Sequence, residues 1–220
     1  MPSVIQLVIA HGGWTLAAIG LLSLVAMAVA IERAFRLLPL RRRFQAKRQA
    51  FIEVWLHSGI TAAAAQVGPV HAGDAMTRVL SAGLAARPRG PEAVRIVALD
   101  AAQREVPEFE RGLTILLVAA QVAPLLGLLG TVIGLIEAFQ VASHAATVTP
   151  SILADGLYKA LGTTVAGLWV AIPSFIAYGL LSTLAGRLAD QLEHAATDLP
   201  VLLHNPQPQS QPQSPVPARP

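Results

Sequence analysis

Three threonines stand out because they lie inside long uncharged segments. Thr131 lies within Gly112–Ile136, and Thr163 and Thr164 lie within Ala160–Gly186; neither range contains a charged residue. A hydroxyl group both donates and accepts a hydrogen bond, so a layer of hydroxyls in apolar surroundings can solvate a carboxyl group or relay a proton. The alternative is structural, because threonine in a lipid-embedded helix commonly bonds its own preceding carbonyl or a neighbouring helix.

Glu137 and Lys159 indicate the height of two of these hydroxyls. Taken as the outer ends of two antiparallel helices, Glu137 lies six residues after Thr131 and Lys159 five before Thr164. At about 1.5 Å per residue, the hydroxyls lie roughly 9 and 7.5 Å deep, in nearly the same layer. Glu137 fits a place on an ion pathway or an ion pair with Lys159, and we favour the pair. Lys159 could also snorkel outward.

Small residues accompany the hydroxyls at helical spacing and predict close helix packing. They are Gly127, Gly130 and Gly134 in the second apolar segment and Ala160, Thr164, Gly167 and Ala171 in the third. Small side chains let helices approach closely in a bilayer, usually for packing alone. Pro124 and Pro173 are expected to bend their helices, because proline removes a hydrogen bond from the helical ladder.

The composition indicates a membrane protein. Hydrophobic residues make up 54% of the 220 residues and charged residues 13%, with a mean hydropathy of +0.56. That charged share is about half the usual one in soluble domains. Each apolar segment, the first being Trp14–Ile31, can meet the roughly 20 residues that a helical span requires. A soluble core built from these helices would need more polar covering surface than 220 residues supply.

Basic residues follow the first span and predict its orientation. Of the 16 Lys and Arg residues, 13 lie between Arg33 and Arg111. A signal peptide carries its positive charge before the apolar core. The order here predicts an uncleaved anchor with its N-terminus outside and its basic flank in the cytoplasm. The basic cluster could also contact anionic lipid or a partner, but topology alone accounts for it; its members are Arg33, Arg36, Arg41, Arg42, Arg43, Lys47 and Arg48.

The expected fold is an all-α membrane protein with three transmembrane helices and long cytoplasmic helical extensions. The outer segments are a periplasmic N-terminus (1–13) and a periplasmic loop (140–158), and the transmembrane helices are 14–31, 112–139 and 159–186. The inner segments are a cytoplasmic helical region (32–111), a helical extension (187–204) and a tail (205–220). In the tail, 6 of 16 residues are Pro and 4 are Gln, which predicts an extended disordered segment.

Signals of soluble enzymes are missing from the sequence. There is no Walker loop, no His-Glu-x-x-His motif and no Gly-x-Ser-x-Gly elbow. The six histidines share no ligand spacing, and the absence of Cys excludes thiolate catalysis and Cys-based metal sites. No basic motif with interleaved aromatics indicates nucleic-acid binding. We therefore expect no enzyme activity, no cofactor, no metal and no nucleic-acid partner.

Two ordered segments resemble the MotA/TolQ/ExbB proton channel family. Ala123–Gly134, with Glu137-Ala138-Phe139 after it, resembles the family's second-helix signature, and Ala160–Pro173 resembles its third. Glu32-Arg33 at the end of the first span also fits. The resemblance covers about Trp14 to Leu199. The chain length and the single long cytoplasmic insertion point to the ExbB/TolQ branch, since flagellar MotA proteins typically have four spans.

The resemblance implies a role in energy transduction at the bacterial inner membrane. Five chains would surround a pore that holds helices of an ExbD- or TolR-like partner, which supplies a protonatable Asp. Thr131 and Thr164 match pore-lining threonines of the family. Proton flow would drive work through a TonB- or TolA-like protein. Some ExbB proteins carry Glu at the position of Lys159, so an acidic role there cannot be carried over.

Two other functional classes fit the same residues. A passive membrane scaffold would use the hydroxyls only to pack helices. The other class is an electroneutral transporter of small solutes. Both the iron- or cobalamin-uptake system and the envelope-maintenance system are compatible with the channel interpretation.

Overall fold

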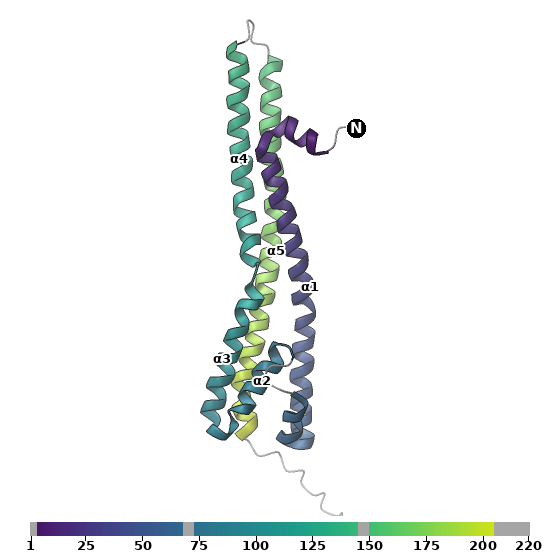
Figure 1. The fold of residues 1–220 in the computed structure, drawn as a ribbon, viewed down its shortest axis with the longest axis vertical. Coiled ribbons are helices and arrows are strands. Elements are labelled where there is room, and N and C mark those ends of the chain that lie inside the picture. The colour runs from purple at the N-terminus through teal and green to yellow at the C-terminus, as the bar shows by residue number, and fades with distance from the viewer. Residues whose placement is uncertain (1–3, 68–72, 145–149, 205–220) are drawn as a thin grey trace, which may run out of the picture. The chain divides into compact units, whose positions relative to one another are not determined.

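The computed structural model describes residues 4–67, 73–144 and 150–204, and every regular element in these ranges is helical (Figure 1). The elements are α1 (Val4–Val67), α2 (Ala75–Ala85), the 3₁₀ helix η1 (Arg87–Arg89), α3 (Pro91–Glu110), α4 (Leu113–His144) and α5 (Pro150–His204). Parts of the predicted N-terminal segment (1–3) and periplasmic loop (145–149), and the whole tail (205–220), lie outside the described residues.

The chain divides into two compact units. Unit 1 comprises Met1–Leu37 and Glu110–Leu184, and unit 2 comprises Leu38–Phe109 and Ala185–Pro220. Among the residues that the structure describes, three helical stretches are long and apolar enough to cross a membrane, namely Gly13–Gly59, Pro91–His144 and Gly156–His204. The prediction of an all-helical chain with three such helices is confirmed.

Several helices continue past the apolar segments that were predicted to span the membrane. α5 is a single helix of 55 residues that runs from Pro150 to His204. α4 runs to His144 and α5 starts at Pro150, both inside the range predicted as a loop. α3 ends at Glu110 and α4 begins at Leu113, so a turn separates these two helices. Gly112 makes that turn with φ +77°, a left-handed conformation that favours glycine.

Unit 1 buries many small side chains and exposes many of its large apolar ones. Buried positions of α4 recur every three or four residues at Leu116, Ala119, Ala123, Gly127 and Gly130. Large apolar side chains face outward instead, and Trp169 of α5 is 79% exposed. Water-soluble proteins seldom expose a large continuous apolar surface. In a bilayer, lipid or a partner helix covers such side chains while small residues form the helix contacts. The packing of unit 1 therefore agrees with three membrane-crossing helices.

Unit 2 has the opposite packing, with large apolar side chains in its core. Five large side chains are almost fully buried, namely Phe44, Met76, Val79, Leu188 and Leu192. Leu188 and Leu192 lie four residues apart in α5, so they share one face of that helix. The rings of Phe44 and Phe109 lie 6.1 Å apart between centroids and tilted by 59°, a geometry typical of aromatic pairs. This unit has the core of an ordinary water-exposed helical domain.

Polar contacts fix α2 within unit 2. The side chain of Asp74 caps α2 by accepting a hydrogen bond from the Thr77 backbone N–H at 3.2 Å, and Lys47 of α1 donates to the same carboxylate at 2.9 Å. Arg78 donates two hydrogen bonds to the carboxylate of Glu105 on α3. These bonds raise the pKa of the Arg78 guanidinium above its ordinary value. The two ion pairs connect α2 to α1 and to α3.

Replacing Asp74 with Ala should lower the free energy of unfolding by about 1 kcal/mol, the usual cost of losing an N-cap. Burial acts to raise the pKa of Asp74, but hydrogen bonds from Lys47 and Thr77 and the Lys47 charge outweigh it and lower the pKa. The contribution of the charged form is therefore complete above a pH of about 4 and is lost as the pH falls further. Urea unfolding of wild type and D74N between pH 3 and 7 tests this. Asparagine keeps the cap without the charge, so a pH dependence equal to wild type would contradict the assignment.

Candidate functional site

Three hydroxyl groups meet where α4 and α5 lie side by side in unit 1 (Figure 1). The Oγ1 atoms of Thr131 and Thr164 are in direct hydrogen-bonding contact. Both helices therefore place these hydroxyls at the same height, as the depth estimate predicted. Thr163 lies beside them, 2% exposed, and its hydroxyl donates to Ala160 O at 2.7 Å. Thr131 and Thr164 are only half-buried.

The cluster has more acceptors than hydrogen atoms to fill them. The carbonyl oxygen of Gly127 lies within bonding distance of all three hydroxyls, at 3.1 Å from Thr131, 3.1 Å from Thr163 and 3.3 Å from Thr164. The hydroxyl of Thr131 also reaches Ala160 O at 3.2 Å. Each hydroxyl carries one hydrogen atom and can donate once at a time. The cluster therefore has several complete hydrogen-bond arrangements, and the bond between Thr131 and Thr164 can point in either direction.

Close approach of the two backbones brings these groups together. A Cβ atom added to Gly127 would lie 2.9 Å from Thr163 O, and one added to Gly167 would lie 2.5 Å from Ala123 O. A Cβ at Gly134 would meet the Cβ of Ala160 at 3.0 Å. Any side chain at Gly127 or Gly167 would force the helices apart. The small residues that the sequence singled out thus lie on the contact face, and Ala171 is buried as well.

Thr15 of α1 joins the cluster from a third helix. Its side chain is 3% exposed, and its Oγ1 and that of Thr163 would lie 3.0 and 2.6 Å from a Cβ added to Gly130. The hydroxyl residues predicted from the sequence all lie in the second and third spans and do not include Thr15. Depth reasoning alone would not have placed it in the hydroxyl layer, since Thr15 directly follows Trp14 at the start of the predicted span, about 1.5 Å below its outer end.

The remaining predicted residues lie outside the cluster. The side chain of Glu137 is exposed and that of Lys159 is half-buried, and their pairing stays a prediction. Pro124 lies inside α4 and Pro173 inside α5, and each helix is continuous across its proline; the predicted bends stay predictions. Among the residues that the structure describes, no group of three or more His, Cys, Asp or Glu side chains could hold a metal ion.

Comparison with known proteins connects this geometry to a family. Residues 71–194, which include α4 and the contact face of α5, match the MotA/TolQ/ExbB proton channel family. The chain belongs to this family. The resemblance seen in the two helix signatures is thereby confirmed, and with it a membrane protein with transmembrane helices.

Named relatives lie in the ExbB/TolQ branch. The chain is 47% identical over 93 residues to biopolymer transport protein exbB1 of Vibrio cholerae, covering 42% of this chain and 41% of the relative. It is 34% identical over 121 residues to Tol-Pal system protein TolQ of Haemophilus influenzae, covering 53% of each. A putative ExbB-like protein 3 of Synechocystis sp. is 31% identical over 156 residues, covering 70% of this chain and 73% of the relative. The chain thus spans about half the length of the first two relatives.

Proposed function

We propose that this chain is the channel-forming subunit of a proton-driven motor in the bacterial inner membrane. The observation that carries the proposal is the contact between Thr131 and Thr164, because it joins the two family signatures in one hydroxyl layer. The family supports a channel-type, energy-transducing subunit and is not a family of enzymes. The proposed orientation has the N-terminus in the periplasm and the C-terminus in the cytoplasm, from the basic flank of span one.

The hydroxyl layer supports a relay and a docking position for a carboxyl group. When Thr164 donates to Thr131, a lone pair of Thr164 can accept a proton from outside the pair; when Thr131 donates, Thr164 can offer its own hydrogen. Neither state leaves a donor without an acceptor, because Gly127 O and Ala160 O take the remaining hydrogen atoms. A half-buried pair whose bond can point in either direction suits repeated protonation of a mobile acid.

The acid itself must come from a partner. Within the three predicted spans of this chain, Glu137 is the only carboxylate, and it lies near the outer end of its helix. A carboxylate in a poorly hydrated pore has a raised pKa, so it can load a proton on one side and release it on the other. We propose a homo-pentamer around the helices of a single-span ExbD- or TolR-like protein. A TonB- or TolA-like protein would carry the work to the outer membrane.

Energetics make such coupling feasible. Each charge that crosses 100 mV yields about 2.3 kcal/mol, so a few protons supply enough free energy to rotate or displace a helix. Transport of biopolymers or maintenance of the envelope would be the output, by analogy with the names of the relatives.

Proton flux into vesicles tests the proposal. The chain and its single-span partner are co-purified, reconstituted into vesicles and given a potassium-diffusion potential. We expect proton uptake that needs both proteins and no added solute. Uptake that requires a solute would favour a transporter, and no uptake by an assembled complex would contradict the channel function.

A passive scaffold is the second candidate. The observation that favours it is that every hydroxyl of the cluster can donate to an acceptor within this chain. Under that alternative the cluster only closes the contact between α4 and α5. Removing the hydroxyl groups would then weaken the assembly but would have no specific effect on proton flux.

A further inference from the structure

The cytoplasmic part of α1 carries cations that the protein itself does not neutralise. Several basic side chains of the described residues form ion pairs with acids, among them Arg36, Lys47, Arg48, Arg78, Arg95 and Arg104. In the described ranges, no acid lies within 4.0 Å of the consecutive residues Arg41, Arg42 and Arg43. Among the basic residues that follow the first span, Arg36, Lys47 and Arg48 are thus paired with acids. The three consecutive arginines between them have no partner among the described acids.

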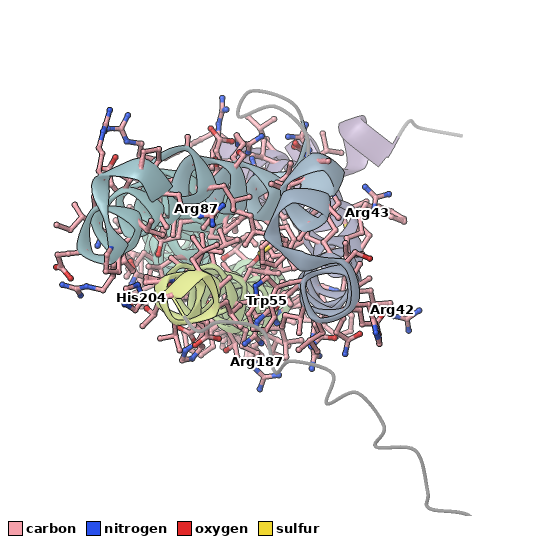
Figure 2. All side chains as sticks on the ribbon, turned by 90° about the horizontal axis from the view of Figure 1, so that it is seen from below. Arg42, Arg43, Trp55, Arg87, Arg187 and His204 are labelled. Atoms are coloured by element: carbon pink, nitrogen blue, oxygen red, sulfur yellow. The ribbon has the colours of Figure 1, made fainter. Side chains whose placement is uncertain are left out.

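These three arginines cover the outer side of α1. All are exposed, whereas Phe44, the next residue, is completely buried in unit 2. Successive helical residues are about 100° apart, so the three guanidinium groups fan over more than half of the helix circumference. Figure 2 shows Arg42 and Arg43 pointing away from the other helices of unit 2. Their charge is directed into the surroundings of the protein.

Along α1, the three arginines directly follow a segment with exposed apolar side chains. Exposed apolar side chains continue past Glu32, with Phe35 79% exposed and Leu38 61% exposed, and the charges of Glu32 and Arg36 neutralise each other. The run of three arginines therefore begins at Arg41, three residues after the exposed Leu38. Helical side chains lean towards the N-terminus of their helix, which here is the direction of the apolar segment. A long arginine side chain can reach an interface in this way.

We propose that Arg41–Arg43 bind the phosphate groups of anionic phospholipids at the membrane surface. Arginine matches phosphate with two parallel hydrogen bonds, and its charge favours an anionic headgroup over a zwitterionic one. Topology explains why the region is basic. It does not explain why these three cations remain unpaired while their neighbours Lys47 and Arg48 each have an acid partner. The inference does not depend on proton conduction.

Lipid titration of the purified, full-length assembly tests this inference. Phosphatidylglycerol or phosphatidylcholine is added in detergent, and bound lipid is counted by native mass spectrometry. We expect wild type to prefer phosphatidylglycerol, and the double substitution R42Q/R43Q to weaken that binding about 25-fold, or about 5-fold for each charge. R42K/R43K should keep most of the preference, because it keeps the charge.

R87Q/R89Q is the matched control, since it also removes two exposed arginines without an acid partner among the described residues, from η1 in unit 2. It should bind phosphatidylglycerol as wild type does. Equal binding of the two lipids by wild type would overturn the proposal. An acidic protein segment would then be the better candidate ligand for the three arginines. An equal loss in R42Q/R43Q and R87Q/R89Q would also overturn it, because binding would then follow net charge alone.

Discussion

Thr164→Val is expected to lower potential-driven proton flux at least tenfold while the complex still assembles. Valine has nearly the shape of threonine but can neither donate nor accept a hydrogen bond. The substitution therefore removes one end of the bond to Thr131 and one of the hydroxyls that can donate to Gly127 O. Thr131→Val removes the other end and should give a loss of similar size. Flux in reconstituted vesicles and the mass of the purified complex are the two measurements.

Thr183→Val provides a matched control for both substitutions. Thr183 lies in α5 as well, but its exposed hydroxyl donates only to Gly179 O of its own helix, at 2.8 Å. We expect normal flux from this variant and partial recovery in Thr164→Ser, which restores a hydroxyl. A uniform loss in all three threonine-to-valine variants would show that the effect comes from packing. Full flux in Thr131→Val and Thr164→Val would reject the hydroxyl pair as part of the path.

Gly167→Ala is expected to destabilise unit 1 by forcing two helix backbones apart. The added Cβ would lie 2.5 Å from the backbone oxygen of Ala123 and 3.2 Å from the Cα of Gly127, so α4 and α5 must separate. Overpacking of this kind costs about 1–3 kcal/mol. Thermal unfolding of the purified protein in detergent, followed by circular dichroism, measures the loss. Separation of the helices would also break the contact between Thr131 and Thr164, so flux should fall together with stability.

Gly179→Ala is the control for that experiment. Gly179 lies in the same helix, and a Cβ there would meet nothing within 4 Å of the protein. Alanine is a better helix former than glycine by up to about 1 kcal/mol, so this variant should be as stable as wild type or more stable. Equal destabilisation by both substitutions would contradict the close contact between α4 and α5.

The sequence predicts the membrane helices well because the bilayer imposes a simple rule on them. Long uncharged runs and small residues at helical spacing were enough to identify α4 and α5 and their contact face. The equal height of Thr131 and Thr164 followed from counting residues in two antiparallel helices. A straight helix turns sequence distance into depth at a fixed rise, which is why that estimate succeeded.

Other features depend on tertiary contacts that a single sequence does not reveal. The side chain of Thr15 reaches the cluster only because α1 packs against Gly130. The turn at Gly112 interrupts a region whose spacing is helical on both sides. The choice of which cations pair was also hidden, since Arg48 and its partner Asp198 are 150 residues apart in the chain.

Water access to the hydroxyl layer is the most direct test of the account. The chain has no cysteine, so Thr164→Cys introduces a single thiol, and Leu21→Cys on the exposed apolar side of α1 is its reference. Both variants are treated with a charged, water-soluble thiol reagent in native membranes together with the partner protein. We predict that the thiol at position 164 reacts readily and the thiol at position 21 does not. An unreactive position 164, or equal protection of both, would place these side chains against lipid or sealed packing and contradict a hydrated proton path.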